Sequence, residues 1–274
     1  MNGSRFDVIT DAHVHMGYYP RLGREDLEYY SPRRMLGVLN RCGVREFIVS
    51  STCAQIAEIG IDAIVREAQE MKRLAGDRAH IFFWLSGHLF EEDPKMSWMD
   101  GGLFEGVKFH EKETPWFLCR RVELRRILDR IAERGLPVQF HTGDDAGCRP
   151  SELATLAKDY PSVRFDFAHC RLPVQSAAVL AECPNVYVDT AYFDGDFSEL
   201  RGYEWRGRLM YGSDLPVWQA QRDVSLTAFY RKNLTDFYRA FQQNHVGFHK
   251  FLNGMSCAVS QNQYNERIKQ DGKL

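Results

Sequence analysis

Short apolar runs alternate with amphipathic stretches along most of this 274-residue chain. Eight of the runs predict strands, near residues 6, 46, 80, 105, 137, 163, 186 and 208. Helical or irregular segments separate one predicted strand from the next. Repeated βα units of this kind predict a parallel sheet, because each parallel strand needs a crossover before its neighbour.

Several stretches between the runs carry apolar residues at the spacing of one helix face. In the stretch from 61 to 76 these residues are Ile61, Ile64, Val65, Ala68 and Met71. The stretch from 122 to 135 has a second stripe, made of Leu124, Ile127, Leu128 and Ile131. Gly135 is the expected stop of that helix. Ser31 and Pro32 predict the start of another helix, which Gly43 closes.

Eight βα units over this span predict a (β/α)8 TIM barrel, an α/β fold. The rival is an open doubly wound sheet, which would show a glycine-rich phosphate turn after its first strand, and the sequence has none there. We expect one domain over residues 1–274, with the barrel at about 5–243 and a helical or frayed C-terminal extension at about 244–274. An aromatic stripe around Phe237 is expected to pack inward rather than to form an oligomer surface.

Composition narrows the choice of partners and compartment. The formal net charge is −2 and the pI is near 6.5, so no basic field favours nucleic acid or an anionic membrane. The apolar runs are too short to span a bilayer, and the opening residues lack the apolar centre of a signal peptide. The seven cysteines include no Cys-x-x-Cys pair, which predicts reduced thiols in the cytoplasm. We expect a small-molecule substrate, and a homo-oligomer is left open.

The predicted strand ends carry most of the candidate chemistry. His13 and His15 lie two apart at the end of the first strand, so both imidazoles leave on one face, as two ligands of one ion would. The fourth, fifth, sixth and eighth strands end in Lys108 and His110, His141, His169, and Asp214. Imidazoles and a carboxylate are ligands that zinc, cobalt, iron or manganese accept, and a catalytic ion keeps one position open for water.

Five motifs in chain order resemble the amidohydrolase superfamily, and most of all its amidohydrolase-2 branch of metal-dependent hydrolases and decarboxylases. They are "DAHVH", "GVKFH", "PVQFHTG", "RFDFAHC" and "MYGSDLP", and the resemblance runs from about residue 6 to residue 218. The resemblance implies one divalent ion, with zinc as the first expectation. It implies His13, His15, His141 and Asp214 as the metal ligands.

The same resemblance assigns the catalytic roles. Asp214 would also handle the proton of the attacking water, and His169 would stand off the metal as acid, base or carbonyl polariser. Binuclear relatives bridge two ions with a carbamylated lysine or a glutamate from the fourth strand, and a bridging Lys108 is kept as an alternative. His110 shares a strand face with Lys108, so the two are expected to enter the same space.

Further side chains near the strand ends are candidate substrate contacts. Alongside Lys108 and His110 we expect Arg171 and Trp218 to touch the substrate, with Arg149 as an alternative partner for a substrate carboxylate. Cys170 is out of phase with His169 and is expected to be a buried structural thiol. The irregular stretch 88–102 is expected either to act as a lid over the pocket or to pack on a neighbouring element.

The sequence therefore predicts a metal-dependent hydrolase that acts on a small-molecule amide, ester or lactone through an activated water. The alternative is a metal-dependent non-oxidative decarboxylase of an aromatic or unsaturated carboxylic acid. A third hypothesis is a barrel that only binds a metabolite. It is disfavoured because a complete set of metal ligands has little purpose in such a protein.

Overall fold

The computed structural model describes residues 9–20, 27–193, 195–217, 226–241 and 245–254. Nine strands form one curled sheet in the order β2-β1-β3-β4-β5-β6-β7-β8-β9. β2 pairs with β1 in the antiparallel sense, and every other neighbouring pair is parallel. The strands are β1 (Thr10–Pro20), β2 (Leu27–Tyr30), β3 (Glu46–Ser51), β4 (Ala79–Trp84), β5 (Gly106–Phe109), β6 (Val138–His141), β7 (Phe165–Ala168), β8 (Val186–Asp189) and β9 (Leu209–Met210).

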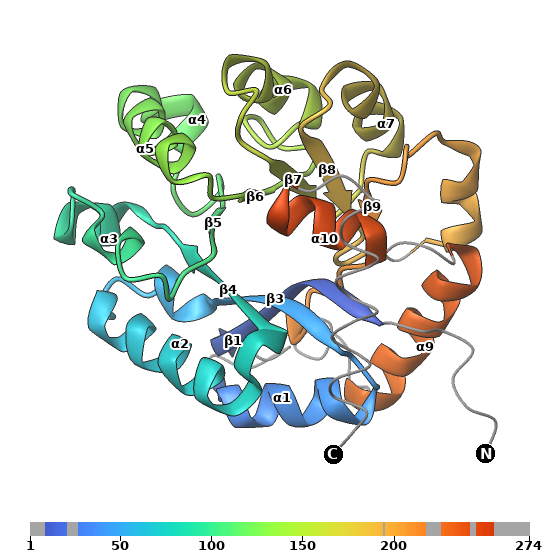
Figure 1. Ribbon diagram of the computed structural model, residues 1–274, viewed down its shortest axis with the longest axis horizontal. Helices are drawn as coiled ribbons and strands as arrows, with labels where there is room; N and C mark the ends of the chain where they lie inside the picture. Colours follow the sequence, from blue (N-terminus) through green and yellow to red (C-terminus); the bar gives the residue numbers. More distant parts are fainter. Residues whose placement is uncertain (1–8, 21–26, 194, 218–225, 242–244, 255–274) are drawn as a thin grey trace.

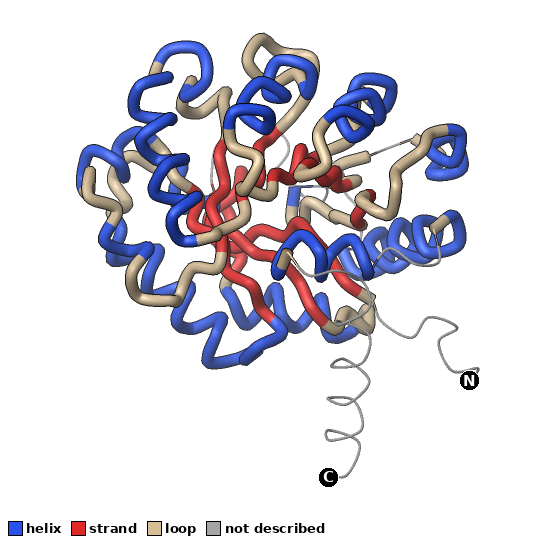
Figure 2. Tube along the Cα trace, turned by 45° about the horizontal axis from the view of Figure 1, so that its top comes forward, coloured by secondary structure: helices blue, strands red, loops and turns tan. Residues whose placement is uncertain are grey.

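Most of the helices lie around the outside of the curled sheet, whereas α10 lies within their ring (Figures 1 and 2). The α-helices are α1 (Pro32–Arg41), α2 (Ile61–Ala75), α3 (Gly87–Glu92), α4 (Trp116–Cys119), α5 (Arg121–Arg134), α6 (Pro150–Asp159), α7 (Pro173–Glu182), α9 (Leu226–Ala240) and α10 (His245–Asn253). Short 3₁₀ segments are η1 (Thr52–Gln55), η2 (Gly76–Arg78), η3 (Ser97–Met99) and η4 (Phe197–Gly202). None of the helices in the described ranges is long and apolar enough to cross a membrane.

The predicted α/β class with a parallel sheet is confirmed. Seven of the parallel strands match predicted runs in position, and the first, predicted near residue 6, is described from Thr10 onward, because residues 1–8 lie outside the described ranges. The antiparallel arm made by β2 was not predicted. Backbone hydrogen bonds also join β1 to the segment after β9. Ala12 N donates to Tyr211 O at 2.7 Å, and His15 N donates to Leu215 O at 2.6 Å. These bonds hold β1 next to the segment that follows β9.

The helix patterns are also confirmed, because their apolar stripes are the buried faces. In α5 the buried residues are Leu124, Ile127, Leu128 and Ile131, and the helix ends at Gly135 in the left-handed conformation. The side chain of Ser31 accepts a hydrogen bond from Arg34 N at the start of α1. Phe237 of α9 is fully buried, as expected for a stripe that packs inward.

α10 fills one end of the curled sheet. Its Phe248 and Phe251 are fully buried and belong to a cluster with strand residues that include Phe82 and Tyr187. Gly106 lies in the same layer, where a Cβ atom would come within 2.5 Å of the Phe82 ring. The predicted C-terminal extension therefore contributes to the core through Phe248, Phe251 and Leu252 of α10, and 255–274 lie outside the described residues.

The stretch 88–102 packs on the fold instead of covering the histidines. It contains part of α3 and all of η3, and its Phe90, Met96, Trp98 and Met99 are all buried. The Trp98 ring stacks on Phe83, with the ring centroids 4.0 Å apart. Among the described residues, none from this stretch lines the histidine pocket. The structure thus favours the packing interpretation over the lid.

Candidate metal centre

The two histidines of β1 point into one space, as the strand period predicts. His13 and His15 are almost fully buried, and their Nε2 atoms lie 3.1 Å apart. Asp214, four residues beyond β9, places its Oδ1 atom 3.0 Å from His15 Nε2 and 3.6 Å from His13 Nε2. One ligand atom from each of the three residues lies within 4.8 Å of the other two. The two ends of the parallel sheet thus build a single potential metal centre.

The Nδ1 atoms of His13 and His15 each contact a polar side chain on the side away from the potential metal centre. His13 Nδ1 lies 2.8 Å from Asp189 Oδ2. Since a carboxylate oxygen can only accept a hydrogen bond, His13 Nδ1 is the donor. His15 Nδ1 is 3.0 Å from the hydroxyl of Ser50. When the ring proton is on Nδ1, the Nε2 atom of His13 has a lone pair that faces the centre. This is the usual arrangement of a metal-binding histidine.

The protonation states in the centre suit a divalent cation. Burial lowers the pKa of His15 to about 4, so its imidazole is neutral near pH 7. Burial alone would raise the pKa of Asp214, but the hydrogen bond from His15 and the nearby imidazoles hold it well below its usual value. Neutral imidazoles beside an ionised carboxylate are the forms that bind zinc and similar ions.

A second group of histidines lies next to this centre. The ring centroid of His141 is 4.0 Å from that of His110 and 4.4 Å from that of His169. His141 Nε2, His169 Nε2 and His110 Nδ1 are buried and have no hydrogen-bond partner. Buried polar atoms are rarely left unpaired, so these nitrogens are available to a ligand. His141 lies in the same pocket but outside the group of three, so its place in the ligand set remains a prediction.

Lys108 lies at the base of the pocket. Its side chain is almost completely buried, and Nζ is 3.1 Å from His13 Nε2. Burial lowers the pKa of Lys108 to about 8, although the nearby carboxylates of Asp189 and Asp214 raise it.

These side chains enclose a pocket of about 120 Å³. Besides the histidines and Asp214, it is lined by Tyr19, Gln55, Trp84, Lys108, Arg171, Tyr192 and Val217. Arg171 is exposed at the mouth, where its guanidinium carbon is 5.0 Å from the centre of the Tyr192 ring. Arg149 does not line the pocket and instead lies 3.6 Å from Glu152. Trp218 lies outside the described residues.

The backbone around the pocket is strained. His169, Tyr192 and Asp214 all have positive φ angles, of 82°, 54° and 57°. Such conformations are uncommon outside glycine, and they cluster at functional sites where the surrounding structure enforces them. Cys170 next to His169 is fully buried, and burial raises the pKa of its thiol, in agreement with the structural role expected for it.

Sequence reasoning missed the residues behind the pocket. Asp189, Gln139 and Asp166 are fully or almost fully buried, and Gln139 Nε2 lies within hydrogen-bond distance of both carboxylates. Polar residues inside otherwise apolar strands were the available signal. Tyr19 was missed because it belongs to the unpredicted arm formed by β1 and β2.

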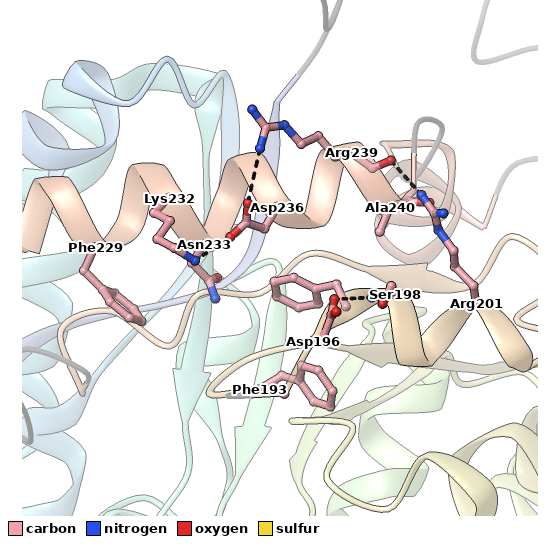
Figure 3. Close-up of a pocket in the computed structure, with 12 residues that line it drawn as sticks. Phe193, Asp196, Ser198, Arg201, Phe229, Lys232, Asn233, Asp236, Arg239 and Ala240 are labelled. Atoms are coloured by element: carbon pink, nitrogen blue, oxygen red, sulfur yellow. Dashed lines mark hydrogen bonds and ion pairs between the residues drawn. The ribbon is translucent and has the colours of Figure 1, made fainter.

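A larger hollow of about 580 Å³ lies between η4 and α9 (Figure 3). Phe193 and Phe229 contribute rings to its wall. Its charged side chains pair locally, since Lys232 Nζ is 2.7 Å and Arg239 Nη1 is 3.6 Å from the carboxylate of Asp236. None of the described residues that line it is a histidine or a cysteine. The hollow therefore lacks the chemistry of the histidine pocket.

Comparison with known proteins identifies the family. Residues 11–236 match the family model described as Amidohydrolase. A sequence search of curated proteins gives no significant match.

Solved structures with a similar fold include three bacterial and fungal proteins. An amidohydrolase from Burkholderia multivorans with bound zinc has a TM-score of 0.60 at 12% identity, covering 93% of this chain and 98% of that one. A probable 2-pyrone-4,6-dicarboxylic acid hydrolase from Acinetobacter baumannii with citric acid bound has a TM-score of 0.59 at 11% identity, covering 90% and 96%. IDCase from Metarhizium anisopliae has a TM-score of 0.59 at 12% identity, covering 90% and 95%. At such identities the likeness concerns the fold.

Proposed function

Because this chain belongs to the amidohydrolase family, we propose that it is a metal-dependent hydrolase of a small-molecule amide, ester or lactone. The observation that carries the proposal is the convergence of His13, His15 and Asp214 within 4.8 Å of one another at the base of a buried pocket. A buried cluster of imidazoles and a carboxylate has little purpose in a protein that only packs or binds a partner.

We assign His13, His15 and Asp214 as metal ligands and His141 as the fourth. Zinc is the proposed ion, because nitrogen and oxygen donors in this ratio suit it and a structural relative carries it. When bound, such an ion lowers the pKa of water and polarises a carbonyl group.

The catalytic steps that we assign to the chain concern protons and orientation. Asp214 is ionised and accepts a proton of the attacking water at a carboxylate oxygen. His169 lines the pocket, and its Nε2 atom has no partner within the protein, so it is free to accept a hydrogen bond or a proton from the attacking water or the substrate. His110 offers its unpaired Nδ1 as a further hydrogen-bonding group for the substrate.

The charges of the pocket favour a small anionic substrate. Lys108 lies at its base and Arg171 at its mouth, and Asp214 is the one carboxylate among the lining residues described. No carboxylate of the described residues pairs with Arg171, whose planar guanidinium suits a substrate carboxylate. We keep Trp218 as a proposed substrate contact, since it directly follows the lining residue Val217.

Non-oxidative decarboxylation of an aromatic or unsaturated acid is the second candidate. The C–C bond of a carboxylate bound beside Lys108 would break to release carbon dioxide, and the carbon that carried it would take up a proton from water or a protonated pocket residue. Trp84 and Tyr192 would flank the unsaturated part of the substrate. The same residues serve both reactions, so the products have to decide between them.

Two further parts of the proposal concern the fold and the surroundings of the protein. We propose that the sheet is a closed (β/α)8 barrel, supported by the hydrogen bonds between β1 and residues 211–215.

The six cysteines of the described ranges are all free, which supports a cytoplasmic location. We expect no nucleic acid or membrane partner, and leave self-association open.

The test is a panel of small esters, lactones, amides and unsaturated acids, with and without a carboxylate, given to the zinc-loaded protein. Proton release without loss of carbon identifies the hydrolase, and carbon dioxide release identifies the decarboxylase. Asp214→Ala should abolish turnover, whereas His88→Ala should retain it, because His88 contacts Ser86 and Ile59 outside the pocket. A zinc-loaded protein that turns over no member of the panel contradicts the proposal.

A further inference from the structure

Asp189 is a fully buried carboxylate at the end of β8, directly behind the pocket. Its Oδ2 atom accepts hydrogen bonds from His13 Nδ1 at 2.8 Å and from Gln139 Nε2 at 3.2 Å. Its Oδ1 atom accepts from the backbone N–H groups of His169 at 2.9 Å and Ala191 at 2.8 Å. The four donors come from β1, β6 and the segments directly after β7 and β8, so a single side chain links these parts of the sheet.

The contact with His13 decides which nitrogen of that ring carries the proton. Three of the four donors to Asp189 are N–H groups of amides, so they favour the ionised form of the carboxylate. An ionised carboxylate accepts only, and His13 therefore holds its proton on Nδ1. The Nε2 atom then presents a lone pair towards His15 and Asp214.

Asp189 also acts on His169, through the backbone. The bond to His169 N holds this residue at its positive φ of 82°. His169 Nδ1 lies 3.0 Å from the carbonyl oxygen of Ala191, which can only accept, so the ring proton is again on Nδ1. Ala191 is itself fixed by the same oxygen of Asp189 that binds His169 N. The Nε2 atom of His169 is left unprotonated and without a partner.

We propose that Asp189 is a positioning residue that sets the ring protons of both His13 and His169, so that each presents an unprotonated Nε2 atom to the pocket. The consequence for metal affinity rests on the proposed function, whereas the tautomers themselves exist without metal. The role is comparable to that of carboxylates behind metal-binding histidines, whose loss weakens metal binding by about 10- to 100-fold.

Asp189→Asn separates this role from a merely structural one. The amide oxygen of asparagine still accepts from the two backbone N–H groups, so the link between β7 and β8 is kept. Its NH₂ group faces His13 Nδ1 and drives the proton of that ring to Nε2, where it blocks metal binding. Glu111→Gln is the control, because Glu111 is a buried carboxylate that accepts from the backbone N–H groups of Phe117 and Leu118, lies outside the pocket and has no hydrogen bond to His13 or His169.

The experiment measures zinc affinity by chelator competition, and the ¹⁵N chemical shifts of His13 and His169 in the metal-free protein. We expect Asp189→Asn to weaken zinc binding by about 10- to 100-fold and to move the His13 proton to Nε2, while Glu111→Gln changes neither. Wild-type spectra alone test the tautomers if the variant does not fold. A wild-type His13 protonated on Nε2, or an Asp189→Asn variant with unchanged shifts and affinity, overturns the proposal. A wild-type protein with the expected tautomers that binds no zinc overturns the proposed function and leaves the role of Asp189 in place.

Discussion

His15 Nε2, on the first strand of the sheet, lies 3.0 Å from Asp214 Oδ1, beyond the last strand. The contact depends on the curl of the sheet, because β1 and the segment after β9 are brought together by backbone hydrogen bonds such as that from Asp214 N to His13 O, 2.8 Å long. The potential metal centre and the meeting of the two sheet ends are thus one feature of the fold.

Removal of a ligand should empty the metal centre. We expect the purified wild-type protein to hold about one zinc-like ion per chain and His15→Ala to hold close to none, since this change removes one of the three converging donors. His88→Ala is the control and should keep the ion. Elemental analysis of the dialysed proteins is the measurement. Two ions per wild-type chain would instead support a bridging Lys108.

His169→Asn should separate metal binding from turnover. The imidazole of His169 lines the pocket with a free Nε2 atom but lies outside the group of converging donors. We expect the variant to keep its metal and to lose a factor of about 10² to 10⁴ in kcat, the usual effect of removing a general acid or base. If zinc content falls together with kcat, His169 is a ligand.

Arg171→Met should weaken binding of anionic substrates selectively. Loss of a charged hydrogen bond at an exposed mouth predicts a KM about tenfold higher for a substrate with a carboxylate, and an unchanged KM for its neutral analogue. Arg149→Met is the control, because Arg149 lies next to Glu152 and outside the pocket. Equal effects of Arg171→Met on both substrates would argue against a carboxylate contact.

Trp98→Ala should affect stability rather than kinetics. The Trp98 ring is buried against Phe83 and Phe104 and does not reach the pocket. Truncation of a buried aromatic residue typically costs about 3 to 5 kcal/mol of unfolding free energy. We expect a clear drop in the urea midpoint with unchanged zinc content and KM. A changed KM at unchanged stability would restore the lid interpretation.

The stability of the protein should depend on pH through His80, which lies far from the metal centre. Burial alone would lower its pKa, but the hydrogen bonds to Glu105, at 2.6 Å, and to Glu46 raise it above the usual value of 6.5. A pKa that is higher in the folded state means that protonated His80 stabilises the fold. This contribution is complete below about pH 6.5 and is lost as the pH rises through the raised pKa.

Urea unfolding of the wild type and His80→Gln measures this effect. The wild type should exceed His80→Gln in unfolding free energy at about pH 5.5, and the difference should shrink at about pH 8.5. Glu105→Gln removes the main partner of His80, so the pH dependence of that difference should flatten in its background. A difference that grows with pH would have the wrong sign for a raised pKa.

Most of the elements and the main chemical groups could be predicted from local sequence patterns. The apolar stripe of α5 and its stop at Gly135 follow from helix geometry, which is local. The two-residue period of a strand is also local, and it places His13 and His15 on the same face. The five ordered motifs predicted membership of the amidohydrolase family, and the match of the family model to residues 11–236 confirms it.

Which groups meet, and what they do together, depends on contacts between elements that the sequence patterns do not reveal. The role of Asp189 depends on β8 lying beside β7 and facing β1 across the curled sheet, and the burial of Trp98 depends on Phe83 from another element. The arm formed by β1 and β2 brings Tyr19 to the pocket, although no local pattern in β2 predicted a strand. Periodicity fixes the direction of a side chain relative to its own element, whereas its partners are fixed by contacts between elements that lie far apart in the chain.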